Sequence, residues 1–458
     1  MTAEISALRR AVESQTDRIG ELTEAVAARD ARIAELEKLL EDSRRSGKRQ
    51  AAPFSKGVPS DEPARPGRRS GEDHGRHSHR RVPAGPIDRE LQAPLPACCP
   101  GCGGTVEHLR DEEQFHTELP EARPVITRFT VGVGRCTKCK RRVQGRHGEQ
   151  TSDALGAAAA QIGPHAKALA VWLHYALGMS FAKTAKLLGH LGVSVTAGAI
   201  CSASQATGTD LVPIQAGIVE RVNTAPMVVM DETGWRVEGE GAWLWTATSK
   251  TATAYNVADG RGFDEATVLL DADYEGTLVR DGWAVYRRYS RAAHQTCTAH
   301  LLRRAEEMIT DGPDWARGTP REVKEILHTA LNARDLPARQ RRAVAEDLAE
   351  RIELLADQAH PHEANQRLVK HLMTETDALF TFLHDPEIDA TNWRGEQAIR
   401  PAVVNRKVWG GNRTWRGAAS QSRIMSAIRT AGEQGIDPIG FLVRLARAPD
   451  PTAVSIFA

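Results

Sequence analysis

Apolar side chains recur every seven residues along the first forty residues of the chain. The first core position of this repeat holds Ile5, Val12, Ile19, Val26, Ile33 and Leu40, and the second holds Leu8, Leu22 and Leu36. β-Branched residues at the first position with leucine at the second favour two parallel strands. We therefore predict a parallel coiled coil over residues 1–43 that forms a homodimer or higher oligomer. An amphipathic helix docked on the rest of the chain is the alternative.

The apolar pattern stops after residue 43. Residues 44–90 are rich in Arg, Ser, Gly, Pro and His, and they contain twelve basic against six acidic side chains. Such a segment has too few apolar side chains to bury a core, so we predict a disordered basic linker. Its charge would suit phosphate contacts, and a solvated spacer explains the composition equally well.

Two CxxC pairs follow the linker. Their cysteines are Cys99, Cys102, Cys136 and Cys139. Four thiolates close a tetrahedral shell around Zn²⁺, and a closed shell makes the site structural. Residues 124–134, between the pairs, have the β-branched composition of a strand, so we predict a zinc ribbon over residues 91–150. A redox pair is the weaker alternative because no βαβ pattern surrounds either motif.

Helical periodicity returns between residues 151 and 220. The stretch from Phe181 to Gln205 has the layout of a helix-turn-helix, with a turn at Gly192 and an N-cap at Thr196. Its second helix would carry mostly small side chains, whereas a helix that reads DNA presents polar or basic ones. A DNA-reading helix-turn-helix and a plain helical core therefore both stay open.

From residue 226 the pattern changes to short β-branched runs, some of which end in an acid. The predicted strands cover residues 227–237, 241–249, 251–259 and 277–286, with a helix over residues 264–270. Asp231 and Asp281 fall within the first and last of these strands. This order predicts a mixed α/β sheet whose carboxylates meet at one place. A helical pattern resumes near Glu396, which is a third acid.

Three such carboxylates have the chemistry of a divalent-metal site. Mg²⁺ prefers oxygen ligands and is usually held by carboxylates and substrate phosphates. Two ions can activate the attacking oxygen and stabilise the leaving oxygen in a displacement at phosphorus. Asp231, Asp281 and Glu396 are therefore candidate ligands for two Mg²⁺ or Mn²⁺ ions. Taken singly, each acid would more often be an ordinary solvated residue.

Basic and aromatic residues surround Glu396. Between residues 392 and 430, eight basic side chains accompany this single acid, and three tryptophans are interleaved with them. A positive field attracts phosphates, and an indole can stack on a base. The candidate DNA contacts are Arg394, Arg400, Arg406, Lys407, Trp409, Arg413, Trp415 and Arg416. Trp409 and Trp415 fall in a Gly-rich stretch expected to be a loop, whereas core packing is the better explanation for Trp393.

Composition excludes several classes of protein. A chain of 458 residues is too long for one ordinary core. Its 60 basic and 59 acidic residues give a net charge of +1, so any DNA contact must come from local clusters of charge. Seven cysteines are too few for a disulfide scaffold. Because the sequence lacks a long apolar run and a secretory signal pattern, we expect a cytoplasmic protein without membrane contact.

Three segments resemble, in order and spacing, the transposases of the insertion-sequence-66 family. They are DETGWRVEGEGAWLW from residue 231, VRDGWAVY followed by QTCTAHLLRR, and NWRGEQAIRPAVVNRKVWGGNRTWRGA from residue 392. The resemblance implies an RNase H-like catalytic core over residues 221–300 and 390–458 with a helical insertion over residues 301–389. It also implies that Asp231, Asp281 and Glu396 are the catalytic DDE triad.

Cys297 and His300 resemble the CxxH motif of several DDE transposases. One cysteine and one histidine do not complete a zinc shell, so we expect them to support the site structurally.

The expected fold class is multidomain α/β, with an N-terminal coiled coil, a zinc ribbon, a helical DNA-binding region and an RNase H-like mixed-sheet catalytic core carrying an α-helical insertion. The resemblance implies an enzyme that cleaves the ends of a bacterial insertion sequence and transfers the strands into target DNA by transesterification. Its partners would be double-stranded terminal inverted repeats, target DNA and small accessory proteins, at the nucleoid. Two alternatives stay open, namely a dimeric sequence-specific DNA-binding regulator with a catalytically silent core, and a metal-dependent nuclease without strand transfer.

Overall fold

The computed structural model describes residues 82–121 and 123–457. The predicted coiled coil over residues 1–43 and most of the linker over residues 44–90 lie outside these ranges, so both stay predictions. By its contacts the chain divides into two units, Met1–Glu121 and Ala122–Ala458. Among the described residues there is no helix with the length and apolarity that a membrane crossing requires.

Residues 82–121 of the first unit contain one tight turn and otherwise irregular backbone. The turn lies at the first CxxC pair. The Gly103 N–H donates to the Cys99 carbonyl at 2.8 Å, and the Cys99 N–H donates to the Gly104 carbonyl at 2.8 Å. Gly103 has a positive φ of 76°, a conformation that glycine adopts without strain.

The second unit starts with a small antiparallel hairpin formed by β1 (Val133–Arg135) and β2 (Arg142–Gln144). The strand predicted over residues 124–134 is wrong for most of its length, because regular pairing begins only at Val133. Val125 and Ile126 are about nine-tenths exposed and have no sheet face on which to pack. β-Branched composition alone does not make a strand without a partner.

A helical region follows the hairpin. Its helices are α2 (Pro164–Tyr175), α3 (Phe181–His190), α4 (Ala197–Asp210) and α5 (Val212–Asn223). The predicted N-cap at Thr196 is confirmed, since its hydroxyl accepts the Ala199 N–H at 3.2 Å. Ala170, Leu188 and Ile200 form the small core of α2, α3 and α4.

A mixed five-stranded sheet forms the centre of the second unit. The strands are β3 (Met227–Val237), β4 (Glu240–Thr248), β5 (Thr253–Ala258), β6 (Thr277–Arg280) and β7 (Ala293–Thr296), in the spatial order β5-β4-β3-β6-β7. β3, β4 and β5 are antiparallel neighbours, whereas β6 and β7 run parallel to β3. The prediction of a mixed α/β sheet is confirmed. The fourth strand ends earlier than predicted, and a 3₁₀ helix, η3 (Ala284–Arg288), follows it.

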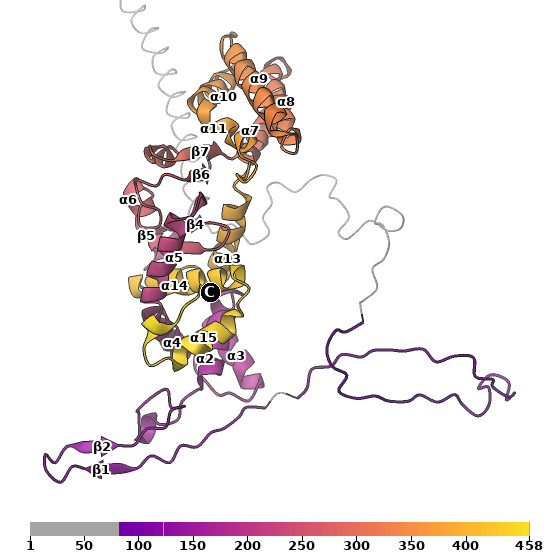
Figure 1. The fold of residues 1–458 in the computed structure, drawn as a ribbon, viewed down its shortest axis with the longest axis vertical. Helices are drawn as coiled ribbons and strands as arrows, with labels where there is room; N and C mark the ends of the chain where they lie inside the picture. Colours follow the sequence, from indigo (N-terminus) through magenta and orange to yellow (C-terminus); the bar gives the residue numbers. More distant parts are fainter. Residues whose placement is uncertain (1–81, 122, 458) are drawn as a thin grey trace, which may run out of the picture. The chain divides into compact units, whose positions relative to one another are not determined.

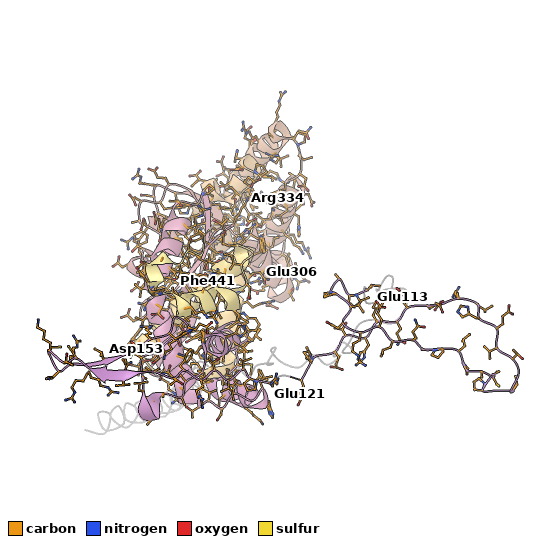
Figure 2. The ribbon with its side chains drawn as sticks, turned by 60° about the horizontal axis from the view of Figure 1, so that its bottom comes forward. Glu113, Glu121, Asp153, Glu306, Arg334 and Phe441 are labelled. Carbon is orange, nitrogen blue, oxygen red and sulfur yellow. The ribbon has the colours of Figure 1, made fainter. Side chains whose placement is uncertain are left out.

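Alternating residues of β3 face two different cores. Val228 and Met230 join the core on one side of the sheet, whereas Met227 and Val229 join the core on the other. The second core also contains the helices between β7 and residue 390. These are α7 (Thr298–Asp311), α8 (Gly318–Asn332), α9 (Ala338–Ala356), α10 (Glu363–Thr374), α11 (Thr376–Leu379) and α12 (Thr381–His384) (Figure 1). Glu306 and Arg334 belong to this helical insertion (Figure 2).

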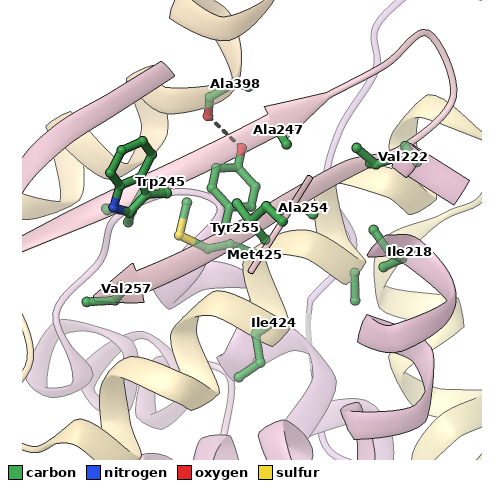
Figure 3. Close-up of a cluster of buried hydrophobic side chains, with 14 of the residues drawn as sticks. Ile218, Val222, Trp245, Ala247, Ala254, Tyr255, Val257, Ala398, Ile424 and Met425 are labelled. Atoms are coloured by element: carbon green, nitrogen blue, oxygen red, sulfur yellow. Dashed lines mark hydrogen bonds between the residues drawn. The ribbon is translucent and has the colours of Figure 1, made fainter. Parts of the chain in front are cut away.

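Three further helices complete the core that Val228 and Met230 join. They are α13 (Trp393–Trp409), α14 (Trp415–Glu433) and α15 (Pro438–Arg447). Phe441 of α15 is fully buried there (Figure 2). Tyr255 of β5 lies among Trp245, Met425 and other apolar side chains, and its hydroxyl donates to the Ala398 carbonyl at 2.6 Å (Figure 3).

Helix α14 covers the free edge of β5 with a row of hydroxyls. The N–H groups of Thr253, Tyr255 and Val257 donate to the hydroxyls of Thr430, Ser426 and Ser422 at 3.1, 2.8 and 3.1 Å. Alternate N–H groups of an edge strand point outward, and residues four apart share one face of a helix. The two periods therefore match, and the backbone donors of the edge are satisfied.

Candidate active site

Asp231 and Asp281 lie close together just beyond the point where the parallel pairing of β3 with β6 stops. The last paired residues of β3 and β6 are Val229 and Val279. Each aspartate lies two residues beyond its paired valine. Residues at the same register position of neighbouring parallel strands are adjacent, so the pairing brings the two carboxylates together, although β3 itself continues to Val237.

The surroundings of Asp231 disfavour its negative charge. Burial, followed by the charges of Glu232 and Asp281, raises the pKa of Asp231 from 3.8 to about 7. Asp231 Oδ1 accepts the Glu232 N–H at 3.0 Å, and Asp281 Oδ1 accepts the Trp283 N–H at 2.8 Å. Within residues 82–121 and 123–457, no lysine, arginine or histidine forms a salt bridge with either aspartate. A divalent cation would neutralise such a pair.

Glu396 belongs to the first turn of α13, and this turn lies against Asp231. A Cβ placed on Gly395 would be 3.2 Å from the Asp231 Cβ, so glycine permits the close approach. The Glu396 carboxylate is half-exposed, with Oε1 3.9 Å from His300 Nε2 and 4.0 Å from Arg303 Nη2. The structure therefore places the backbone of Glu396 beside the aspartates, while its side chain faces His300 and Arg303.

A complete metal shell is not preformed. In the described part of the chain, no three His, Cys, Asp or Glu side chains are grouped so that they could hold one ion. The uncompensated, largely buried Asp231 and its neighbour Asp281 nevertheless fit the donor chemistry of Mg²⁺ or Mn²⁺. Glu396 would have to turn from His300 toward Asp231 to join them.

Glu232 differs sharply from Asp231, although the two residues are adjacent. Its side chain is almost fully buried, forms an ion pair with Arg261 at 2.5 Å, and accepts a hydrogen bond from the Tyr286 hydroxyl. Arg261 in turn lies between the rings of Trp243 and Trp283, 4.5 and 4.1 Å from their centroids. Sequence reasoning missed this group. The adjacent acids were a signal, but only the partners show that Glu232 is already engaged.

Cys297 links the start of α7 to Asn392 at the start of α13, and Asn392 in turn contacts β3. It is fully buried at the start of α7, and its Sγ accepts the Asn392 N–H at 3.1 Å. The Asn392 side chain donates to the Met230 carbonyl at 3.4 Å. These contacts hold the start of α13 against the sheet beside Asp231, while His300, one turn further along α7, faces Glu396.

Two basic residues among the candidate DNA contacts are engaged within the protein. Arg394 forms an ion pair with Asp389 at 2.5 Å. The Arg406 guanidinium donates to the Gly234 carbonyl and to the Thr233 hydroxyl, and desolvation lowers the pKa of Arg406. The remaining exposed candidates are Arg400, Lys407, Arg413, Trp415 and Arg416.

Trp409 is helical and partly buried against the core, contrary to the expected loop. It is the last residue of α13, stacks on His174 at 4.6 Å and meets Trp235 edge-on at 5.8 Å. Burial in this cluster lowers the pKa of His174 to about 4. Trp415 is the first residue of α14 and is exposed. Of these two indoles, only that of Trp415 is free to stack on a base.

The segment between α13 and α14 is fastened to the far end of β3. The Asn412 N–H donates to the Arg236 carbonyl at 2.9 Å, and the Glu238 N–H donates to the Asn412 carbonyl at 2.9 Å. The Asn412 side chain accepts the Trp235 indole N–H at 2.7 Å. β3 therefore connects Asp231 to the basic segment around Arg413, which is hydrogen-bonded to the end of this strand.

Helix α4 packs closely against α14, whereas a helix that reads DNA would leave its surface exposed to solvent. A Cβ on Gly208 would come within 2.6 Å of the Ser420 Cβ, so α4 and α14 are in close contact. Arg423 of α14 also donates to the Gly208 carbonyl at 3.1 Å. The exposed positions of α4 include Ser202, Ala206 and Thr209, and none of these is basic. This packing favours the helical core over a DNA-reading helix.

The two CxxC turns share one hydrogen-bond pattern. At the second turn the Lys140 N–H donates to the Cys136 carbonyl at 2.9 Å, and the Cys136 N–H donates to the Arg141 carbonyl at 2.8 Å, as at Cys99. Backbone N–H groups, chiefly those of Gly101 and Cys139, lower the pKa values of the Cys99 and Cys136 thiols. Thiolate is the form that binds metal. The four-cysteine zinc site draws on both units and stays a prediction.

Residues 159–420 match the family model described as Transposase IS66 family, which is more than half of the chain. The chain belongs to the IS66 transposase family. The matched range contains Asp231, Asp281 and Glu396, and it leaves out both CxxC pairs. The chain is also 25% identical over 313 residues to "Uncharacterized protein y4qI" of Sinorhizobium fredii (strain NBRC 101917 / NGR234). The alignment covers 60% of this chain and 54% of that protein, so this IS66-family chain spans about half the length of its relative.

Proposed function

We propose that this chain is a DDE-type DNA transposase that cleaves DNA at the ends of a bacterial insertion sequence and joins the freed 3′ ends to target DNA. Membership of the IS66 family supports transposition as the process. The pairing of β3 with β6, which places Asp231 beside Asp281, is the observation that carries the assignment of the reaction centre. Glu396 is the third proposed catalytic carboxylate.

The arrangement of the sheet supports an RNase H-like core. Three antiparallel strands are followed by two parallel ones, with β3 in the centre of the sheet. The helical insertion enters after β7 and returns the chain to α13, beside β3. This order accounts for the wide separation of Asp281 and Glu396 in the sequence.

The carboxylates would hold divalent cations, Mg²⁺ or Mn²⁺, two per active site. Asp231 and Asp281 supply adjacent, uncompensated oxygen donors, and Glu396 would complete the second site. Bound there, the ions would supply charge neutralisation for the attacking and leaving oxygens at phosphorus. The protein itself orients the carboxylates through the strand pairing, through Gly395 and through the Cys297–Asn392 contact.

The proposed partners follow from the charge of the molecule. Arg400, Lys407, Arg413 and Arg416 are exposed cations that would contact phosphates of the double-stranded terminal repeats and of target DNA. We further propose a structural Zn²⁺ at the four cysteines and a coiled-coil homodimer or higher oligomer. Small accessory proteins are further candidate partners. A protein that recombines chromosomal DNA would work in the cytoplasm, at the nucleoid.

A strand-transfer assay tests the proposal. The purified full chain is incubated with Mg²⁺ or Mn²⁺, a pre-cleaved element end and supercoiled target DNA. Joined products are expected for the wild type and for Asp264→Asn, which changes an exposed acid of α6 (Phe263–Ala266). Asp231→Asn and Glu396→Gln are expected to abolish joining while DNA binding persists.

Other outcomes would select the alternative functions. Metal-dependent cleavage without joining would identify a nuclease. Specific binding of element ends without cleavage by the wild type would identify a regulator with a silent core.

A further inference from the structure

A buried ion pair joins the helical insertion to β6, the strand that ends directly before Asp281. Arg280 and Glu375 are almost completely buried, with side-chain exposures of 2% and 0%, and Arg280 Nη1 lies 2.5 Å from Glu375 Oε2. Arg287 Nη1 binds the other carboxylate oxygen at 2.7 Å. Glu375 lies at the end of α10, so one carboxylate of the insertion binds both Arg280, which directly precedes Asp281, and Arg287, which lies six residues after it.

These contacts reach the backbone of Asp281 itself. Arg280 Nη1 donates to the Asp281 carbonyl at 3.0 Å and to the Thr296 hydroxyl at 3.0 Å. Thr296 in turn donates to Glu375 Oε2 at 2.6 Å. The Glu375 carboxylate therefore organises the carboxyl ends of both β6 and β7, where the active-site loop begins.

A second residue of α10 fills the space on the other side of Asp281. A Cβ built on Gly282 would lie 2.6 Å from His371 Nε2, so the loop and the imidazole are in tight contact. Arg304 of α7 lies 3.1 Å from His371 Nδ1 and holds the ring in place. Asp281 is thus flanked by the insertion through Arg280 before it and through Gly282 after it.

We propose that Glu375 and His371 are positioning residues for Asp281, so that the helical insertion sets the position of a catalytic carboxylate. The inference rests on the proposed function and assigns the insertion a part in it. A buried ion pair is seldom the most stabilising way to fill a core, because apolar residues of similar volume often stabilise as well or better. A buried ion pair does fix the orientation of the groups that it joins. A metal-binding carboxylate such as Asp281 must also be held in one orientation.

Replacing the carboxylate tests the ion pair. Glu375→Gln keeps the shape but leaves two arginines without their counter-charge, and we expect kcat for DNA joining to fall by about 10²-fold, as for a catalytic group displaced by about 1 Å. KM for DNA should stay unchanged, and Glu375→Asp should restore part of kcat. The matched control is Glu387→Gln, which removes an exposed ion pair between the insertion and Lys250 of the β4–β5 turn. It should leave kcat unaltered.

A compensating pair of variants tests the steric contact and stays informative if Glu375→Gln fails to fold. Gly282→Ala should lower kcat by about 10-fold or more, because the added methyl meets His371 and shifts Asp281. His371→Ala removes the imidazole and should itself lower kcat, because the loop loses the side chain that positions it. In the double variant the added methyl fills part of the vacated space, so the rate should exceed the one that additive losses predict. A structural effect of either substitution alone predicts additive losses instead.

Amide hydrogen exchange measures the same displacement without relying on activity. The Trp283 N–H is held by Asp281 Oδ1, and the Cys297 N–H by the Arg280 carbonyl. Both amides should exchange faster in Glu375→Gln and in Gly282→Ala, and at the wild-type rate in Glu387→Gln. Unchanged exchange together with unchanged kcat would overturn the inference. If the wild type does not join DNA but exchange is altered in the variants, the proposed function alone would be overturned.

Discussion

At the scale of single residues, the adjacent acids Asp231 and Glu232 show how the environment assigns a role. Glu232 has an arginine and a tyrosine as partners, so its charge is compensated. Asp231 has a backbone N–H as its hydrogen-bond partner, and burial together with the charges of Glu232 and Asp281 outweighs the favourable charge of His300, so its pKa is raised. Because both acids are in the same dipeptide, only their partners distinguish the candidate metal ligand from the structural acid.

The raised pKa of Asp231 predicts a pH-dependent stability of the metal-free protein. The folded pKa of about 7 exceeds the ordinary 3.8, so the folded state binds the proton more tightly. The free energy of unfolding should therefore fall as pH rises between these two values, by at most about 1.4 kcal/mol per unit from this group. Urea unfolding in EDTA from pH 5 to 8 measures the slope. Asp231→Asn should flatten it and Asp264→Asn should not; equal slopes in all three proteins would refute the assignment.

Gly395 offers a test of the close approach of α13 to the sheet. In Gly395→Ala the new methyl would meet the Asn392 side chain and the Asp231 Cβ, so α13 must move away. We expect DNA joining to fall by about 10²-fold with DNA affinity kept, because a small misplacement of Glu396 suffices. Gly432→Ala is the control, since a methyl there meets open space at the end of α14. Equal rates for the two variants would contradict the geometry.

The positions of the carboxylates could be predicted from the sequence better than those of the tryptophans. Strand patterns place Asp231 and Asp281 through local periodicity, whereas the position of Trp409 depends on how α13 ends. Gly410, with a φ of 85°, closes the last turn of that helix, so Trp409 remains helical and meets His174. A Gly-Gly pair reads equally well as a loop, and the partner of the indole is over two hundred residues away.

At the scale of elements, the hydroxyl row of α14 predicts a stability effect at the edge of the sheet. Ser426→Ala would leave the Tyr255 N–H buried without an acceptor, and we expect a loss of about 1–3 kcal/mol in the free energy of unfolding. Ser202→Ala, on the exposed side of α4, should change it by less than about 0.5 kcal/mol. Chemical denaturation measures both changes. If Ser426→Ala left the free energy of unfolding unchanged, water would have to accept the Tyr255 N–H in place of the hydroxyl.

Predictability at this scale follows the length of the apolar pattern. β3, β4 and β5 have six or more residues each, with runs of apolar, β-branched and aromatic side chains, and they were predicted with bounds that differ by at most a few residues from those of the structure. β7 has only four residues, AHQT, and its buried positions Gln295 and Thr296 are polar. Its place in the sheet depends on pairing with β6 and on contacts with the insertion, which no local pattern encodes.

At the scale of the whole molecule, near-neutral net charge makes DNA binding depend on a few exposed cations. Arg400→Ala or Lys407→Ala should weaken binding of all DNA sequences and reduce the slope of log K against log salt by about 0.9 for each phosphate that the protein no longer neutralises. Arg342→Ala, on an exposed position of α9, should leave the slope unchanged. Fluorescence anisotropy over a salt series measures this. Equal slopes for all variants would remove α13 from the DNA interface.

The zinc prediction also concerns the whole chain, because two of the four cysteines lie in each of its two units. Metal analysis of the purified protein should find about one Zn²⁺ per chain, and Cys136→Ser should lose it. Cys201→Ser, in α4, should retain it. Full zinc content in Cys136→Ser would show that the four cysteines do not form the site.

The length of β3 has a mechanical consequence. Asp231 and Arg236 are five residues apart on one strand, which is about 17 Å at about 3.4 Å per residue. Arg236 anchors the α13–α14 connection through Asn412, so the proposed phosphate contacts and the proposed catalytic carboxylate are both attached to one nearly inextensible strand. The strand would therefore fix the distance between the site of cleavage and the bound phosphates, whatever bases lie between them.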